Sequence, residues 1–138
     1  MKKLIYTCTA IIGLGFLLSS TSVDYPERGN SSFDVGEKLR YRVTYGFVDA
    51  GEAVMEVKST SKKGNGRSLY QAIGTGRTLA GFNAFFKVDD TYETYLDKQG
   101  IFPWYFKRRV DEGGYIINQD YTFKHHQYKV DNGEGKEF

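Results

Sequence analysis

The chain has 138 residues, with 19 lysine and arginine residues against 17 aspartate and glutamate residues, two histidines and one cysteine. Two of the basic residues, Lys2 and Lys3, lie at the very start, so residues 23–138 carry 17 basic and 17 acidic side chains and no cysteine. This balance disfavours a nucleic-acid partner, since no excess of positive charge remains to attract phosphates. Without cysteine, that part of the chain has no disulfides and depends on packing.

The first 22 residues are typical of a secretory signal peptide. A short basic start is followed by an apolar run over residues 4–18 and by small polar residues at 19–22. A transmembrane anchor is the alternative, but it needs about 20 apolar residues, and this shorter run contains Thr-Cys-Thr at 7–9. Cys8 lies inside the run rather than after it, which disfavours a lipoprotein. We expect an exported protein, periplasmic or associated with the outer envelope, with no transmembrane segment after cleavage.

The rest of the chain has the composition of one β domain. Residues 23–32 are rich in turn formers and lack periodicity, so we interpret them as a leader to a single domain over residues 33–138. With 11 Tyr, 10 Phe, 16 Gly and two Pro, the composition favours strands. An aromatic-packed core and an aromatic-lined pocket both fit this composition.

The most regular pattern lies at the start of the domain. Apolar and polar residues alternate over 38–45, turn formers follow at 46–51, and alternation resumes over 52–58. The pattern predicts a β-hairpin with one buried and one solvated face. In the first strand we expect Tyr41, Val43 and Tyr45 to face the core and Arg40 and Arg42 to face solvent.

Similar alternation continues toward the C-terminus. It predicts strands over residues 69–76, 87–96, 102–110, 115–124 and around 128–130, separated by turns at 62–66, 97–100 and 112–114. Between the first two of these strands, the apolar residues of 78–86 have a three-and-four spacing that predicts a short helical turn. The expected fold is therefore all-β: a curved antiparallel sheet or an open, incomplete β-barrel with one short helical turn near residues 78–86.

The last eight residues contain the Asn132-Gly133 pair of a tight hairpin turn, followed by few residues that could form a returning strand. We therefore expect the last strand to lack a partner and the chain to be truncated at its C-terminus. Unpaired strand edges promote association, so we also expect poor solubility or oligomerisation, with the oligomeric state left open.

No group of side chains resembles a catalytic or metal site. Asp89 and Asp90 are neighbours on a predicted strand and point to opposite faces, and Glu93 is too far along that strand to pair with Asp89. His125 and His126 are split by the same alternation, with no cysteine or third histidine to complete a metal site.

Two further motifs of enzymes are also lacking. The Gly-x-Gly-Arg-Thr run at 74–78 lacks the Lys-Ser/Thr ending of a phosphate-binding loop, and no Gly-x-Ser-x-Gly elbow occurs. We expect neither enzymatic activity nor a cofactor.

One segment carries a resemblance to a known family. Its residues are Phe33, Gly36, Glu37, Leu39, Tyr41, Val43, Tyr45 and Gly46, followed by Ala50, Gly51 and Ala53, with looser matches at Val88, Asp90, Tyr92, Glu93, Pro103, Phe106, Arg109 and 112–114. This run resembles the opening of the DUF3108 family of exported bacterial proteins. The resemblance implies a curved antiparallel sheet or open barrel in the cell envelope, and a longer chain than this one. It assigns no catalytic residues.

Three classes of function fit these observations. The first is non-catalytic binding of an apolar or amphipathic envelope component, lipid-like or glycan; its candidate residues are Leu79, Phe82, Phe85, Phe86, Trp104 and Arg108. The segment 79–86 would form a flap over the open end of the sheet, or only plug that end. In the basic run 107–109, alternation predicts that Arg108 stacks on the side of Trp104 and Phe106. The second class is a structural or protein-interaction β module, and the third, an enzyme acting on glycans or peptides, has no supporting motif.

Overall fold

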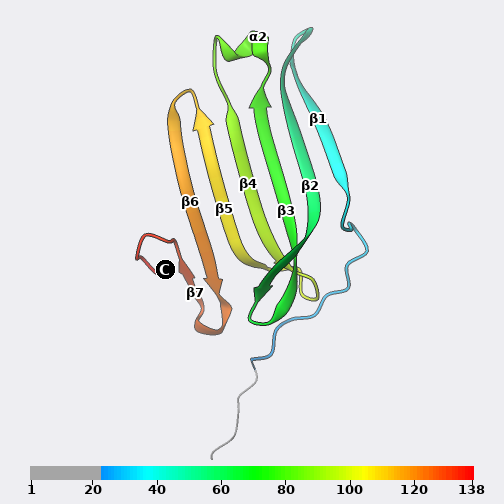
Figure 1. Cartoon of the computed structure of the whole chain (residues 1–138), viewed down its shortest axis with the longest axis vertical. Coiled ribbons are helices and arrows are strands. Elements are labelled where there is room, and N and C mark those ends of the chain that lie inside the picture. Colours follow the sequence, from blue (N-terminus) through cyan, green and yellow to red (C-terminus); the bar gives the residue numbers. More distant parts are fainter. Residues whose placement is uncertain (1–22) are drawn as a thin grey trace, which may run out of the picture.

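The computed structural model describes residues 23–138, so the predicted signal peptide lies outside the described residues. Seven strands form one antiparallel sheet in which each strand pairs with its neighbours in sequence (Figure 1). The strands are β1 (Lys38–Tyr45), β2 (Val48–Gly64), β3 (Arg67–Thr78), β4 (Asp89–Asp97), β5 (Pro103–Glu112), β6 (Tyr115–Lys124) and β7 (Lys129–Asp131). A short helix, α2 (Ala80–Asn83), connects β3 to β4, and a 3-10 turn, η1 (His125–Gln127), precedes β7. Within the described part of the chain, no helix is long and apolar enough to cross a membrane.

Two-residue turns set the register of three hairpins. Gly46 begins the turn between β1 and β2 with a φ of 61°, which only glycine adopts freely. Asn65-Gly66 joins β2 to β3 and Gly113-Gly114 joins β5 to β6, all four with positive φ. These are the turns whose twist matches that of the flanking strands, so neighbouring strands pair directly.

The sheet stays open. β1 and β7 are the two ends of the strand order, and within residues 23–138 they do not pair with each other. The predicted antiparallel all-β fold is confirmed, but α2 covers only Ala80–Asn83 of the predicted 78–86 turn. Figure 1 shows a single layer, with α2 at the end of the sheet where β3 stops. Because the described sheet is not closed, α2 does not plug a barrel.

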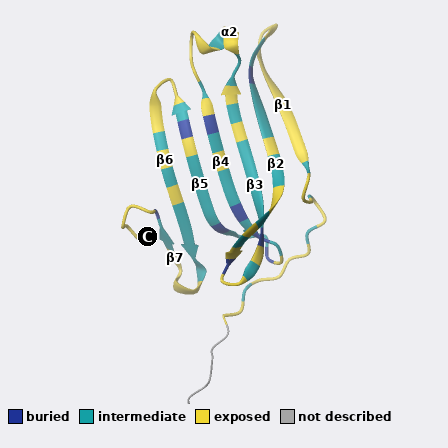
Figure 2. Cartoon of the chain, viewed as in Figure 1, coloured by how far each residue is buried: buried dark blue, intermediate teal, exposed yellow. Residues whose placement is uncertain are grey.

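A cluster of buried residues lies at the opposite end of the sheet, whereas two other buried residues, Asp90 and Val110, lie toward the α2 end (Figure 2). Leu69, Tyr95 and Trp104 form the core cluster. Partly buried aromatic residues pack against it from the leader, from the residue before β5 and from β5 itself: Tyr25, Phe102 and Tyr105. β5 reaches this cluster through an irregularity: Tyr95 pairs with Tyr105 and the next residue, Leu96, pairs with Pro103. Trp104 is thus an extra residue on β5, and it packs on the same side as Tyr105.

Because of this extra residue, two predictions about Trp104 and Arg108 were wrong. Strict alternation placed Trp104 on the face of Phe106 and Arg108, but the bulge sends it to the other face, into the core cluster. Arg108 therefore does not stack on Trp104; its side chain donates to Gln119 instead.

The first strand also differs from expectation. β1 has the predicted alternation, yet all eight of its residues are exposed. Tyr41 is 50% exposed, Val43 52% and Tyr45 77%, so the prediction that these three residues face the core was wrong. β1 is an edge strand of a single-layer sheet, and within residues 23–138 no second layer covers its apolar side.

The C-terminal residues turn back on β7. The amide of Val130 donates to the carbonyl of Phe138 and the amide of Phe138 donates back, each at 2.9 Å. Glu137 forms ion pairs with Lys124 and Lys129. The expectation that the last strand lacks a partner was therefore wrong, because the few residues after Asn132-Gly133 suffice for one narrow pair of hydrogen bonds.

Candidate functional site

The register of the sheet separates its two faces chemically. One row of directly paired residues, Val57, Ala72, Thr94, Phe106 and Tyr121, crosses five strands on one face. The adjacent row on the other face consists of Lys38, Glu56, Ile73, Glu93, Lys107 and Asp120. We call the first the apolar face and the second the polar face.

Ion pairs stabilise the polar face. Glu52 accepts hydrogen bonds from Arg40 and from Arg77, which lie on the strands on either side of it. Burial of the Glu52 carboxylate opposes ionisation, but these two guanidinium groups outweigh it and lower its pKa. Arg109 likewise pairs with Asp120 at 2.6 Å. The charges of this face are thus largely satisfied by one another.

The apolar face contains a groove across the first four strands. Its volume is about 380 Å³, within the range of about 300–1,000 Å³ usual for small-molecule sites. The groove is lined mainly by Phe33, Leu39, Met55, Val57, Ala72, Gly74, Tyr92, Thr94 and Leu96. Phe33 lies at the start of the predicted domain, before β1, and packs edge-on against Tyr70, with ring centroids 5.4 Å apart. The segment that precedes β1 thus supplies one wall of the groove.

The groove is deepest where β3 carries glycine, because glycine has no side chain to occupy it. Gly74 lies between Met55 on β2 and Tyr92 on β4. A Cβ placed on Gly74 would meet only the Cβ of Tyr92, at 4.0 Å, so the position has room for a side chain that the sequence omits. Gly76 lies on the same face two residues further along β3, so this part of the apolar face has no side chains on β3.

The apolar face is largely open to solvent. Met55 is 55% exposed, and Leu39 and Tyr92 are also exposed. Contiguous apolar surface of this kind usually marks a binding site or an interface. Toward the α2 end of this face Asp90 and Val110 are buried, whereas the described residues leave the groove itself open.

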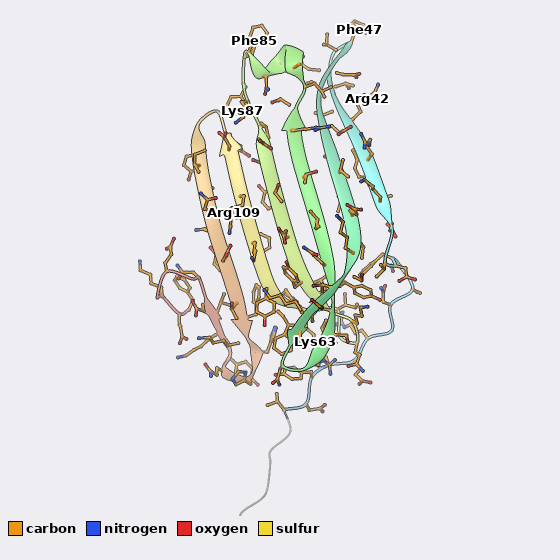
Figure 3. The ribbon with its side chains drawn as sticks, in the orientation of Figure 1. Arg42, Phe47, Lys63, Phe85, Lys87 and Arg109 are labelled. Carbon is orange, nitrogen blue, oxygen red and sulfur yellow. The ribbon has the colours of Figure 1, made fainter. Side chains whose placement is uncertain are left out.

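The structure does not bring the six predicted binding residues together. Phe85 is 85% exposed at the α2 end of the sheet (Figure 3). Phe82 lies beside Phe85, with ring centroids 6.3 Å apart. Phe86 packs against Gly113, in the turn between β5 and β6. Leu79 is held near β2 by a backbone hydrogen bond to Ala50. This segment ends the sheet but does not line the groove.

The other two predicted residues lie elsewhere. Trp104 is only 5% exposed and is part of the core cluster near Gly64, at the Lys63 end of the sheet (Figure 3). Arg108 is on the apolar face, where it pairs across the strands with Tyr92. Of the six residues, only Arg108 adjoins the groove.

The acidic and histidine residues considered above are placed separately. Asp89 pairs with Arg77 and Asp90 pairs with Gly76, so the two carboxylates lie on opposite faces of the sheet, as predicted. A ring nitrogen of His125 lies 2.6 Å from the carbonyl oxygen of Pro103, whereas His126 contacts Gln127.

A second hollow lies beside η1. Its volume is about 490 Å³, and its aromatic lining includes Tyr25, Phe102, Phe123, His125 and Tyr128. The His125 and Phe102 rings in its wall contact each other edge to face, with centroids 4.7 Å apart. We regard the groove on the apolar face as the better candidate, since it is continuous with a larger exposed apolar surface.

Sequence reasoning missed two features. The groove combines Met55, Gly74 and Tyr92 from three strands, and its only sequence signal was the pair of glycines on β3. The buried pair of Arg67 and Asp97 had no signal, because each lies at a strand end among other polar residues.

Comparison with curated proteins and with solved structures found no match. A family model, described as a protein of unknown function (DUF3108), matches residues 40–136. This match covers the sheet from the third residue of β1 through β7, and it includes most of the groove and Arg108. The chain therefore belongs to the DUF3108 family.

Proposed function

We propose that this chain binds an apolar or amphipathic component of the bacterial cell envelope, without catalysis, on the apolar face of its sheet. The observation that carries the proposal is the groove, which lies in apolar surface that the described residues leave uncovered. Burying apolar side chains contributes about 25 cal/mol for each Å² removed from water, so a hydrocarbon chain in the groove would be stabilised by exclusion of water alone.

Gly74 offers a sharp test. Because a side chain at this position would enter the groove without meeting backbone, Gly74→Leu should fill the site and leave the fold intact. Thr75→Leu is the matched control, since Thr75 is exposed and its side chain lies on the polar face. Both changes add a leucine to the same strand, so only the face differs.

The measurement is the fluorescence of an acyl probe with an uncharged fluorophore, titrated with residues 23–138. We expect saturable binding to the original chain and to Thr75→Leu, and at least about tenfold weaker binding to Gly74→Leu, equivalent to about 1.4 kcal/mol. No binding to the original chain would refute the proposal, and so would equal binding to both variants.

A second function, docking of a partner protein, is favoured by the edge strand β1. In residues 23–138 this strand pairs with β2 alone, and its other edge is free to accept an added strand. On its paired edge, the alternating basic and apolar residues of β1 match β2, which carries Glu52 and Glu56 among apolar residues. A strand added at the free edge would meet the same basic and apolar residues. The expected partner is an extended segment with alternating acidic and apolar residues. Binding of such a peptide, but not of its lysine-substituted equivalent, would support this function; equal or no binding would refute it.

A further inference from the structure

Arg108 is a cationic residue on the apolar face of the sheet, where its surroundings on β5 are apolar. It continues the row of paired residues that begins at Leu39 and passes through Met55, Gly74 and Tyr92. Its neighbours on β5 along the same face are Phe106 and Val110. A half-buried guanidinium in such surroundings costs solvation free energy unless an anion or several acceptors compensate.

Arg108 lacks the partner that other arginines of this sheet have. Its Nε donates to Oε1 of Gln119 at 2.7 Å, and Gln119 also accepts from the hydroxyl of Tyr121. No carboxylate of residues 23–138 lies within 4.0 Å of the Arg108 side-chain nitrogens. By contrast, ion pairs are formed by Arg40, Arg42, Arg67, Arg77 and Arg109.

The acidic residue nearest by register does not fill this role. Asp90 lies on the same face, two residues before Tyr92. Its carboxylate accepts the amide of Asp111 at 3.2 Å, and it forms no ion pair with Arg108. A guanidinium has five N–H donors, and a neutral amide oxygen uses one of those of Arg108. The remaining donors are oriented in the planar fork that suits a carboxylate or phosphate.

We infer that Arg108 binds the anionic head group of a single-chain amphiphile whose hydrocarbon chain lies in the groove. This inference rests on the proposed function and names its ligand class. The row from Leu39 to Arg108 crosses four strand spacings, about 19 Å at roughly 4.8 Å each, which is comparable to a long fatty-acid chain. Tyr92 lies between the groove and Arg108, and belongs to both.

The test compares ligands that differ only in their heads. Palmitate, hexadecyl phosphate and hexadecanol compete with the uncharged acyl probe for the groove, each below the concentration at which it aggregates or separates from solution. We expect at least one of the two anions to displace the probe at about tenfold lower concentration than the alcohol, because a hydrogen bond between two charged groups is stronger than one to a neutral hydroxyl. The preferred anion identifies the head group as carboxylate or phosphate.

Variants locate the effect. In Arg108→Gln the preference for the anion should fall to about onefold while hexadecanol binds as before, and Arg108→Lys should keep part of the preference. Arg109→Gln is the control, because Arg109 lies on the polar face and pairs with Asp120. Circular dichroism verifies that each variant is folded.

Two results would overturn the inference: equal displacement by the alcohol and both anions in the original chain, or an anion preference that survives in Arg108→Gln. The first needs no variant, so the inference stays testable even if Arg108→Gln does not fold. Either result, with hexadecanol still bound, leaves the proposed function intact. Failure of all three ligands and of the probe would refute both.

Discussion

The guanidinium of Arg67 donates two parallel hydrogen bonds to the fully buried carboxylate of Asp97, from Nε at 2.6 Å and from Nη2 at 2.8 Å. The carboxylate of Asp97 accepts three more hydrogen bonds, from the indole of Trp104 and from the backbone amides of Gln99 and Gly100. Burial alone would raise the pKa of Asp97, but these five donors outweigh it and lower the pKa to about 2. One carboxylate thus joins the start of β3, the end of β4 and the core tryptophan.

This pair predicts a loss of stability in acid. The pKa of Asp97 is lowered from 3.8 to about 2 on folding, so its contribution is complete above about pH 4 and is lost as the pH falls toward 2. The loss should be about 2 kcal/mol in the free energy of unfolding. Urea unfolding, followed by Trp104 fluorescence at several pH values, measures it.

A control variant is needed to separate the effect of Asp97 from that of Glu137, a second carboxylate that titrates in the same pH range. Ion pairs with Lys124 and Lys129 lower the pKa of the exposed Glu137 to about 2. Asp97→Asn should be destabilised near neutral pH and should lose the part of the acid dependence that is due to Asp97, whereas Glu137→Gln should keep that part. An unchanged acid loss in Asp97→Asn would contradict the prediction.

Core aromatic residues should matter far more than those of β1. Trp104→Ala removes a 5% exposed side chain and should cost about 3–5 kcal/mol. Tyr41→Ala removes a half-exposed side chain and should cost about 1 kcal/mol or less. Urea midpoints followed by circular dichroism compare the two. A Tyr41→Ala loss as large as that of Trp104→Ala would mean that another layer covers the apolar face in solution.

A single added methyl group should disturb the same core. A Cβ on Gly64 would lie 2.2 Å from atoms of the Trp104 ring, so Gly64→Ala must displace the indole and should cost about 1–3 kcal/mol. Gly81→Ala is the matched control: Gly81 lies in α2 with no atom near its Cβ position, and its change should be neutral or slightly stabilising. Equal thermal midpoints for the two variants would contradict this packing.

The aromatic residues near α2 should be dispensable for stability and for the groove. Phe85 is almost fully exposed, and neither Phe82 nor Phe85 lines the groove. The double change of Phe82 and Phe85 to Ser should therefore leave the thermal midpoint and the uptake of the uncharged acyl probe nearly unchanged. Loss of uptake with retained stability would instead support the flap predicted from the sequence.

Much of the fold could be predicted from local patterns. The alternation in β1 and the glycine or Asn-Gly turns after β1, β2 and β5 identify strands and hairpins without reference to distant residues. The same is true of the order of the strands, because such short connections leave consecutive strands adjacent and antiparallel. The resemblance at Phe33 to Ala53 also identified the family.

The candidate site could be predicted only in part. Arg108 was placed on a face with Phe106 by alternation, and that placement is confirmed. Trp104 was placed there too, and one extra residue in β5 reversed its direction, because every side chain changes face when a strand shifts by one position. A bulge of this kind leaves no periodic signal in the sequence.

Local alternation by itself thus determined which residues form strands and, away from the bulge at Trp104, which of them share a face. Only the tertiary structure decided which face is covered. Leu39 and Leu69 have the same alternating surroundings in sequence, yet Leu69 is fully buried while Leu39 remains exposed. The difference arises because the leader, Trp104 and the Arg67–Asp97 pair meet over one end of the sheet, where residues far apart in the chain exclude water together.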